Sequence, residues 1–333
     1  MKIAMVGILG LILATSSGLT AEEGAEKTIT KSFAAAPGGA LKVDLDGGDI
    51  QVLTGDQNTV EVVVERQVTG GTEKQAASLL KSHKVTFTQD GKEVRVEASK
   101  TKKRGFSFRS KPNLSVRVRV TVPRRFNVSL NTDGGTIQVS DLQGTVDARS
   151  SGGDLSFTKI EGAVAGHTSG GNVKAAGCTD KLEVQTSGGN ILLRDYSGTS
   201  ATADTSGGNV DVHSCAGKLQ VKTSGGNIVI DGFSGPGVYA DTSGGAITFG
   251  LDQQPEGDCW LHTSGGNITV RLPENIAMNL IAATDGGNVT TAIPVAATVQ
   301  GKLQEGKLEG KMNGGGPVLS LRTSGGDIRV TKK

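Results

Sequence analysis

The chain has 333 residues and is almost neutral, with 35 Lys and Arg against 33 Asp and Glu, a formal charge of +2. This balance argues against a protein whose whole surface binds polyanions. Because 50 residues are Gly and only 3% are aromatic, the chain also lacks the large side chains that fill the core of a typical globular enzyme.

The N-terminus has the pattern of a secretory signal. Lys2 is followed by an apolar run from Ile3 to Ala14 and then by small residues that end at Ala21. The run is shorter than a membrane-spanning helix requires. We therefore expect residues 1–21 to be a signal peptide and the protein to be exported, to the periplasm or out of the cell. We expect no transmembrane segment in the mature chain.

Residues 22–37 are predicted to be a polar lead-in, and residues 38–125 to combine a first coil with an interruption. The first coil covers residues 38–52. A stack of coils has an exposed first strand that invites pairing with other chains. We therefore interpret the interruption as an N-terminal β-rich cap that covers this edge. In it we predict strands at 59–67, 83–88, 92–98 and 113–122, and a short helix over 73–82.

Residues 126–293 repeat a strand, a Ser-Gly-Gly or Asp-Gly-Gly corner, a second strand and a polar return, mostly every 18 or 19 residues. Around Gly225, the apolar Leu219 and Val221 come before the corner, and Ile228 and Ile230 come after it. This period of two is typical of strands, and a Gly-Gly pair reaches positive φ without steric cost. The corner glycines are Gly47, Gly134, Gly152, Gly170, Gly188, Gly207, Gly225, Gly244, Gly265, Gly286 and Gly325.

Stacking equivalent strands in parallel would bury these apolar positions between two facing sheets. The sequence therefore predicts an all-β, parallel β-solenoid with a packed, dry interior, about 50 Å long at a strand spacing of about 4.8 Å. Two polar columns are also predicted. One consists of the Thr or Ser two residues before most corner glycines, and the other of the Asn two residues after them, such as Asn172 and Asn190. We expect the Asn side chains to hydrogen-bond to one another at a buried corner. Residues 294–317 leave the frame and are predicted to be a flexible hairpin or loop. Residues 318–333 form a terminal coil that closes the rod.

The three cysteines are predicted to be free structural thiols. Cys178 and Cys215 lie two coils apart, about 9.6 Å by strand spacing, and this exceeds the reach of a disulfide. Cys259 occupies an inward position of its strand. The alternative is an intermolecular bond through an exposed return.

The sequence predicts no catalytic residue, no metal and no cofactor. Ser169 follows His167 closely, but serine fills the same place in most corners without a histidine, and no Gly-x-Ser-x-Gly elbow is present. The corners also lack the ladder of carboxylates that calcium needs. Asp204 and Asp241 could form the carboxylate pair of a polysaccharide-cleaving enzyme, although Lys222 between them favours a solvated face.

An outward stripe is the first candidate binding surface. Tyr239, Trp260 and Ile281 occupy the same place in three coils that follow one another in the sequence, beside Asp241 and His262. We expect them to align as an exposed apolar stripe. Aromatic rings on a rigid sheet can bind glycans or partner proteins. The alternative is that the long returns fold back and cover the stripe.

A basic segment between residues 100 and 111 is the second candidate. Two phenylalanines alternate there with several cations, and such a loop can dock on an anionic lipid or polysaccharide surface. A solvated loop without a partner is the alternative, and nucleic acid is not an expected partner of an exported protein. The residues are Lys102, Lys103, Arg104, Phe106, Phe108 and Arg109.

The repeated Ser-Gly-Gly-Asn/Asp-Ile/Val corner, preceded by an apolar-x-apolar-x-Thr strand, resembles the bacterial putative-adhesin family of exported β-strand-repeat proteins, a group of unknown function. The opening segment 38–50 and the strand at Val120–Pro123 resemble it as well, and the match covers about 38–330. The resemblance implies a right-handed β-solenoid in the cell envelope, with an adhesive or scaffolding role and no catalytic residues.

From these observations we expect a non-enzymatic, exported β-solenoid that binds a glycan, an anionic envelope surface or an envelope protein through a flat sheet face. The alternative is a polysaccharide-active parallel β-helix enzyme, a lyase or a glycosidase.

Overall fold

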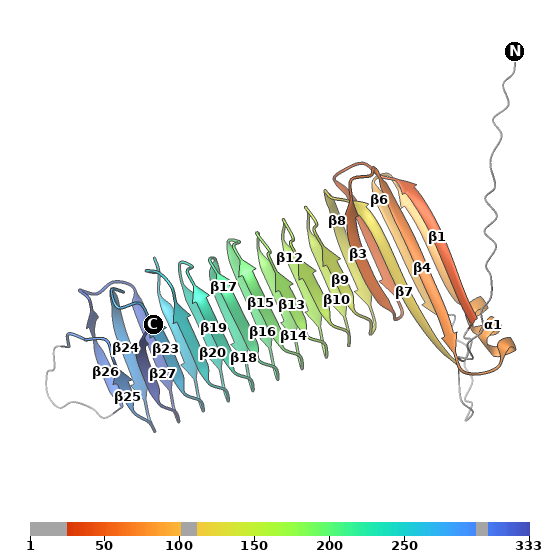
Figure 1. Cartoon of the computed structure of the whole chain (residues 1–333). Helices are drawn as coiled ribbons and strands as arrows, with labels where there is room; N and C mark the ends of the chain where they lie inside the picture. Colours follow the sequence, from red (N-terminus) through yellow and green to blue (C-terminus); the bar gives the residue numbers. More distant parts are fainter. Residues whose placement is uncertain (1–24, 101–111, 298–305) are drawn as a thin grey trace, which may run out of the picture.

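The computed structural model of the chain describes residues 25–100, 112–297 and 306–333. They form a rod built from two long β-sheets, and most neighbouring strands in each sheet run parallel (Figure 1). Each coil contributes one strand to each sheet, and the apolar positions of both strands face the narrow core between the sheets. The predicted all-β, parallel β-solenoid is confirmed.

The first sheet, sheet A, has fourteen strands. Their order across the sheet is β1 (Ala25–Ala34), β4 (Thr59–Thr69), β7 (Asn113–Pro123), β3 (Asp49–Gly55), β9 (Ile137–Ser140), β11 (Leu155–Thr158), β13 (Val173–Ala176), β15 (Ile191–Tyr196), β17 (Val210–Cys215), β19 (Ile228–Phe233), β21 (Ile247–Leu251), β23 (Ile268–Leu272), β28 (Ile328–Lys332) and β25 (Val289–Thr291).

The second sheet, sheet B, also has fourteen strands. Their order is β5 (His83–Asp90), β6 (Glu93–Lys100), β2 (Gly39–Leu45), β8 (Phe126–Thr132), β10 (Val146–Ser150), β12 (Val164–Thr168), β14 (Leu182–Thr186), β16 (Ser200–Thr205), β18 (Lys218–Thr223), β20 (Val238–Thr242), β22 (Cys259–Thr263), β27 (Val318–Thr323), β24 (Met278–Thr284) and β26 (Lys307–Met312).

The interruption after the first coil extends the rod instead of covering its edge. Strands β7, β4 and β1 continue sheet A beyond β3, and β6 and β5 continue sheet B beyond β2. Helix α1 (Glu73–Ser82) begins with a capping box between Thr72 and Gln75 and packs against β4 and β1. The expected polar lead-in was also wrong in part, because β1 is a long edge strand that pairs antiparallel with β4.

The sequence order suggested that the last coil closes the rod, but it does not. Strand β27 lies between β22 and β24, and β28 lies between β23 and β25. The final coil is therefore inserted between two coils that precede it in the sequence, and Val318 N–H donates to Asp258 Oδ1 at 2.8 Å at its entry. In the segment predicted to be a hairpin or loop, β26 pairs antiparallel with β24 and forms the edge of sheet B.

The corners are held by threonines that face inward. Thr186 Oγ1 donates to the carbonyl of Gly171 in the preceding coil at 2.8 Å and accepts the N–H of Gly189 at 3.2 Å. Thr168, Thr205, Thr223, Thr242, Thr263, Thr284 and Thr323 make the same two bonds. These bonds satisfy backbone groups that the tight corner would otherwise bury unpaired.

The Asn column works differently from the prediction. The Asn side chains are exposed, and Asn172 Oδ1 accepts the backbone N–H of Asn190 in the next coil at 2.9 Å, instead of joining a ladder of side chains at a buried corner. The same bond recurs from Asn190 to Asn209 and from Asn209 to Asn227. Each Asn therefore extends the backbone ladder by one bond around the corner.

In the coils from β9 to β19, the return also differs from the expected polar link. Its turn residue lies in the left-handed region, for example Lys159 with φ 53° and Asp195 with φ 50°. The next residue points inward and is buried, as Ile160 and Tyr196 do. The returns thus form a third side of the core, and Cys178 and Cys215 lie on it.

Candidate functional site

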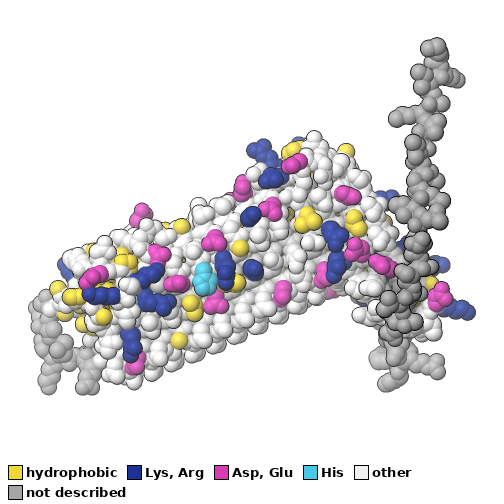
Figure 2. Space-filling view, viewed as in Figure 1, with side chains coloured by type: hydrophobic (Ala, Val, Ile, Leu, Met, Phe, Trp, Pro, Cys, Tyr) yellow, Lys and Arg dark blue, Asp and Glu magenta, His cyan; other side chains and the backbone are white. Residues whose placement is uncertain are grey.

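Among the described residues, the outer face of sheet B carries hollows and two exposed aromatic side chains. In a parallel stack, residues in register on successive strands form a row along the rod, called a file here. The aromatic file contains Gln220, Tyr239 and Trp260, and the polar file contains Lys222, Asp241 and His262. Figure 2 shows one face of the rod, on which cations and carboxylates are interspersed over the middle.

Tyr239 and Trp260 are register partners on the neighbouring strands β20 and β22. They are 40% and 46% exposed, and they are the large hydrophobic residues exposed within the described part of the chain. The returns therefore do not cover them, contrary to the alternative weighed from the sequence. Lys222 Nζ lies 5.6 Å from the centroid of the Tyr239 ring, and this cation–π contact helps to orient the ring.

The predicted continuity of the stripe was wrong. The inserted β27 places Ser320 between Trp260 and Ile281, and Ile281 is half-buried against the edge strand β26. Ser320 is only 3% exposed because its short side chain lies between two large ones. The exposed aromatic surface therefore consists of two residues and not three.

Asp241 and His262 are brought together as the sequence suggested. His262 Nδ1 lies 2.7 Å from Asp241 Oδ1, and both side chains are partly exposed. The pair lies beside the aromatic residues. Along the polar file, Lys222 is next to Asp241 and Arg322 is next to His262. An aspartate in this position orients the imidazole ring and offers further hydrogen-bonding groups next to the aromatic surface.

A hollow of about 570 Å³ opens beside the aromatic pair. Its floor includes Val238, and the returns before β20 and β22 form its wall. Gly237 allows these returns to approach each other, because a Cβ at this position would lie 2.8 Å from the carbonyl oxygen of Asp258. The polar groups around it come from Lys218, Gln220, Glu256 and Asp258, which sequence reasoning missed because they lie in returns without a fixed motif.

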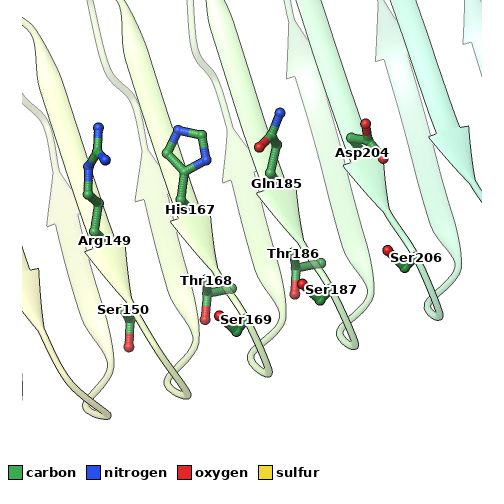
Figure 3. Close-up of a pocket in the computed structure, with 10 residues that line it drawn as sticks. All are labelled: Arg149, Ser150, His167, Thr168, Ser169, Gln185, Thr186, Ser187, Asp204 and Ser206. Carbon is green, nitrogen blue, oxygen red and sulfur yellow. The ribbon is translucent and has the colours of Figure 1, made fainter.

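A second hollow, of about 360 Å³, follows the polar file toward the N-terminus. Figure 3 shows Arg149, His167, Gln185 and Asp204 in one row, with the corner serines at its side and Thr168 and Thr186 turned the other way. His167 and Ser169 both line this hollow. The row mixes a cation, an imidazole, an amide and a carboxylate, a set suited to hydrogen bonding with a polar ligand.

Asp204 and Asp241 lie two strands apart in the polar file, with Lys222 between them. Within the described ranges, no group of three or more His, Cys, Asp and Glu side chains is placed to hold a metal ion. The predicted basic loop lies outside the described residues, as does the expected signal peptide. Where the structure describes the chain, it has no helix of the length and apolar character needed to cross a membrane.

The cysteines are free and buried, as predicted. Burial raises the pKa of Cys178 and of Cys215 to about 11 and that of Cys259 to about 12. Since the thiolate is the reactive form, burial disfavours reaction of all three thiols at neutral pH. They belong to the packing of the core and not to the candidate site.

Comparisons with solved structures found similar chains of low identity. A putative adhesin from Bacteroides fragilis is 14% identical, with 92% of this chain and 97% of that one covered and a TM-score of 0.35. A putative adhesin from Parabacteroides distasonis is 12% identical, with 92% and 97% covered and a TM-score of 0.41. A putative lipid binding protein from the same species is 14% identical, with 92% and 96% covered and a TM-score of 0.40.

A search of curated proteins gave no match. A protein-family model matches residues 39–331, which is nearly the whole described rod, and its description is Toastrack DUF4097. The chain therefore belongs to the Toastrack DUF4097 family.

Proposed function

We propose that the protein is a non-enzymatic, exported rod that binds a partner in the cell envelope or outside the cell, as an adhesin or an envelope scaffold. The outer face of sheet B is the binding surface. The observation that carries this proposal is the exposure of Tyr239 and Trp260 side by side on a rigid sheet. Large aromatic rings are costly to leave in water, so a pair of them on a flat face favours a binding surface.

The architecture supports the same role. The core between the sheets is filled by small aliphatic side chains and a few aromatic ones, which leaves the outer faces and the ends of the rod for ligands. Export is supported by the signal pattern of residues 1–21, and an adhesive or scaffolding role is supported by the family resemblance of the corner motif.

The test is retention of the exported protein on isolated cell-envelope material. We expect Trp260→Ala combined with Tyr239→Ala to lower the bound fraction about tenfold, with little change in Tm because both side chains are exposed. Leu192→Ala, which removes a half-buried apolar side chain from the outer face of sheet A, is the matched control and should bind normally. Equal binding by all three proteins would exclude the aromatic face as the binding surface.

The competing function, a polysaccharide-cleaving enzyme, would use Asp204 and Asp241. Lys222 between them and the bond from Asp241 to His262 favour a solvated polar row instead. Asp204→Asn with Asp241→Asn should therefore change no glycan-cleaving activity of the protein. Cleavage by the wild type that this double variant lacks would establish the enzyme in place of the binding protein.

A further inference from the structure

We propose that the ligand of this face is a linear, uncharged polysaccharide that lies along the rod axis. The inference rests on the proposed function and names its partner class. It starts from the positions of two hollows, the one beside Tyr239 and Trp260 and a third one of about 290 Å³ around Ala165 near the N-terminal half of the rod.

The two hollows lie on the same two files, one that contains Tyr239 and Thr202 and one that contains Lys218 and Ser200. The file that contains Tyr239 continues toward the N-terminus through Gln220 and Thr202 to Glu183 and Ala165. Between the hollows, the outward residues of β16 in these files are Ser200 and Thr202, which are small. Small side chains at these positions would leave a shallow trough between the hollows, and the length of such a trough along the rod suits an extended polymer better than a compact ligand.

The charges along the trough argue against a polyanion. In the N-terminal hollow, Arg149 Nε lies 3.2 Å from Asp147 Oδ1, and Lys181 Nζ lies 3.5 Å from Glu183 Oε2. Around the aromatic pair, cations and carboxylates are again present together. A row of cations that could track a charged chain is absent from the described lining, while hydrogen-bonding groups suited to hydroxyls are plentiful.

The position of the trough argues against a peptide strand. A peptide that adds to a sheet needs a free edge, where backbone N–H and C=O groups are unpaired. The trough instead crosses β10 to β22 in the middle of sheet B, where each strand is already paired on both sides. Two exposed aromatic residues also form too small an apolar area for a lipid surface.

The aromatic pair suits sugar rings. The C–H face of a pyranose ring packs on an aromatic ring while its hydroxyls bond to polar groups at the side. Tyr239 and Trp260 are one strand spacing apart, about 4.8 Å, a distance similar to the length of one sugar residue in an extended β-linked chain. Successive residues of such a chain can therefore lie over successive coils.

The experiment is calorimetric titration of the full protein with uncharged β-linked di-, tetra- and hexasaccharides and with polygalacturonate as an acidic chain. We expect the affinity for the neutral chains to rise with length, to depend little on salt, and to fall about tenfold, equal to about 1.4 kcal/mol, in Trp260→Ala. Thr202→Leu, which fills the trough between the hollows, should weaken the hexasaccharide and leave the disaccharide unchanged.

The inference would be overturned by a preference for polygalacturonate with strong salt dependence or by an affinity that does not depend on chain length. Equal hexasaccharide binding by Thr202→Leu and wild type would overturn it as well. If Trp260→Ala with Tyr239→Ala loses envelope retention while no neutral glycan binds, the face remains the binding surface and the sugar assignment fails. If the retention is unchanged as well, both proposals fail.

Discussion

The two glycines of each corner have different roles, although the sequence analysis assigned both the same one. We expected both to provide positive φ, but the regular corners do not use it, and positive φ occurs at Gly47 and Gly48 of the first corner. A Cβ on Gly189 would lie 2.0 Å from the carbonyl oxygen of Gly171, whereas one on Gly188 has its nearest neighbour at 3.8 Å. The second glycine is therefore required because successive coils touch there through their backbones.

A matched pair of substitutions tests this difference. Gly189→Ala should destabilise the protein by more than about 4 kcal/mol, because backbone atoms of two coils must separate. Gly188→Ala should change the free energy of unfolding by no more than about 0.5 kcal/mol. Chemical denaturation of both variants gives these values, and equal effects would show that the contact between coils does not explain the need for the second glycine.

The inward threonines allow a second test at this scale. Thr186→Val keeps the shape but leaves Gly171 C=O and Gly189 N–H without their partner, and should cost about 1–3 kcal/mol. Thr186→Ser should cost less, because Ser150 makes the equivalent two bonds, both at 2.9 Å, in its own coil. A valine variant as stable as wild type would mean that water replaces the hydroxyl at the corner.

His83 makes the stability of the N-terminal end depend on pH. It is 4% exposed, and burial, Arg66 and Lys100 lower its pKa while Asp46 raises it by a smaller amount. A folded-state pKa below the unfolded value means that the unfolded chain binds the proton first, so stability is full above about pH 6.5 and is lost as the pH falls toward the lowered pKa.

The check is Tm as a function of pH for wild type and His83→Gln. The difference between the two curves should change between about pH 7 and pH 5, with the wild type losing more stability on acidification. Parallel curves would show that His83 does not titrate differently in the folded and unfolded states.

At the scale of elements, the inserted terminal coil is the feature that separates the structure from its sequence. Strand β27 has the same apolar pattern and the same corner as its neighbours, so β22 could accept either β27 or β24. The structure uses β27 and continues the corner bonds through it, since Asp327 N–H donates to Asn267 Oδ1 at 2.8 Å and Asn288 N–H donates to Asp327 Oδ1 at 2.9 Å. Ion pairs of Lys332 with Glu274 and of Lys333 with Asp252 hold its end.

Disulfide trapping distinguishes the two orders. His262 and Arg322 are register partners, so His262→Cys with Arg322→Cys should cross-link on mild oxidation. His262→Cys with Ala283→Cys should not, because β27 separates these positions to about 9.6 Å. The native cysteines should not interfere, since they are buried. A cross-link in the second pair alone would restore the sequential order.

The coils could be predicted from the sequence, but their order along the rod could not. The period of two around each corner predicted strands, and the predicted short helix over 73–82 is present as α1. The order of the coils could not be predicted because strands with similar apolar faces, such as β22, β24 and β27, can be stacked in any order. The return turns were missed because Lys159 and Asp195 adopt positive φ without the glycine that usually indicates it. The edge strand β1 was missed because its partner β4 lies far away in the sequence.

The candidate site was predictable to the same extent. The register of β20 and β22 follows from the repeat, so Tyr239 with Trp260 and Asp241 with His262 were paired correctly. Ile281 was misplaced by the order of the coils. The wall residues Glu256 and Asp258 were missed because they lie in a lengthened return, where no period fixes the position of a side chain.

At the scale of the whole molecule, the described part of the rod combines a rigid stack with an exposed aromatic pair, Tyr239 and Trp260, on a mixed polar face. Every coil contributes one residue to each file, so a row of recognition groups can extend along the rod without any change of fold. Trp260 is the single tryptophan of the chain, and its fluorescence therefore reports on this face alone.

The measurement that tests the central claim most directly is the emission of Trp260 during titration with isolated cell-envelope material, with binding followed in parallel by sedimentation. The indole is 46% exposed, so a partner seated on it should shift its emission to shorter wavelength in a saturable way that follows the bound fraction. Binding by sedimentation with unchanged emission would contradict the claim that the outer face of sheet B is the binding surface.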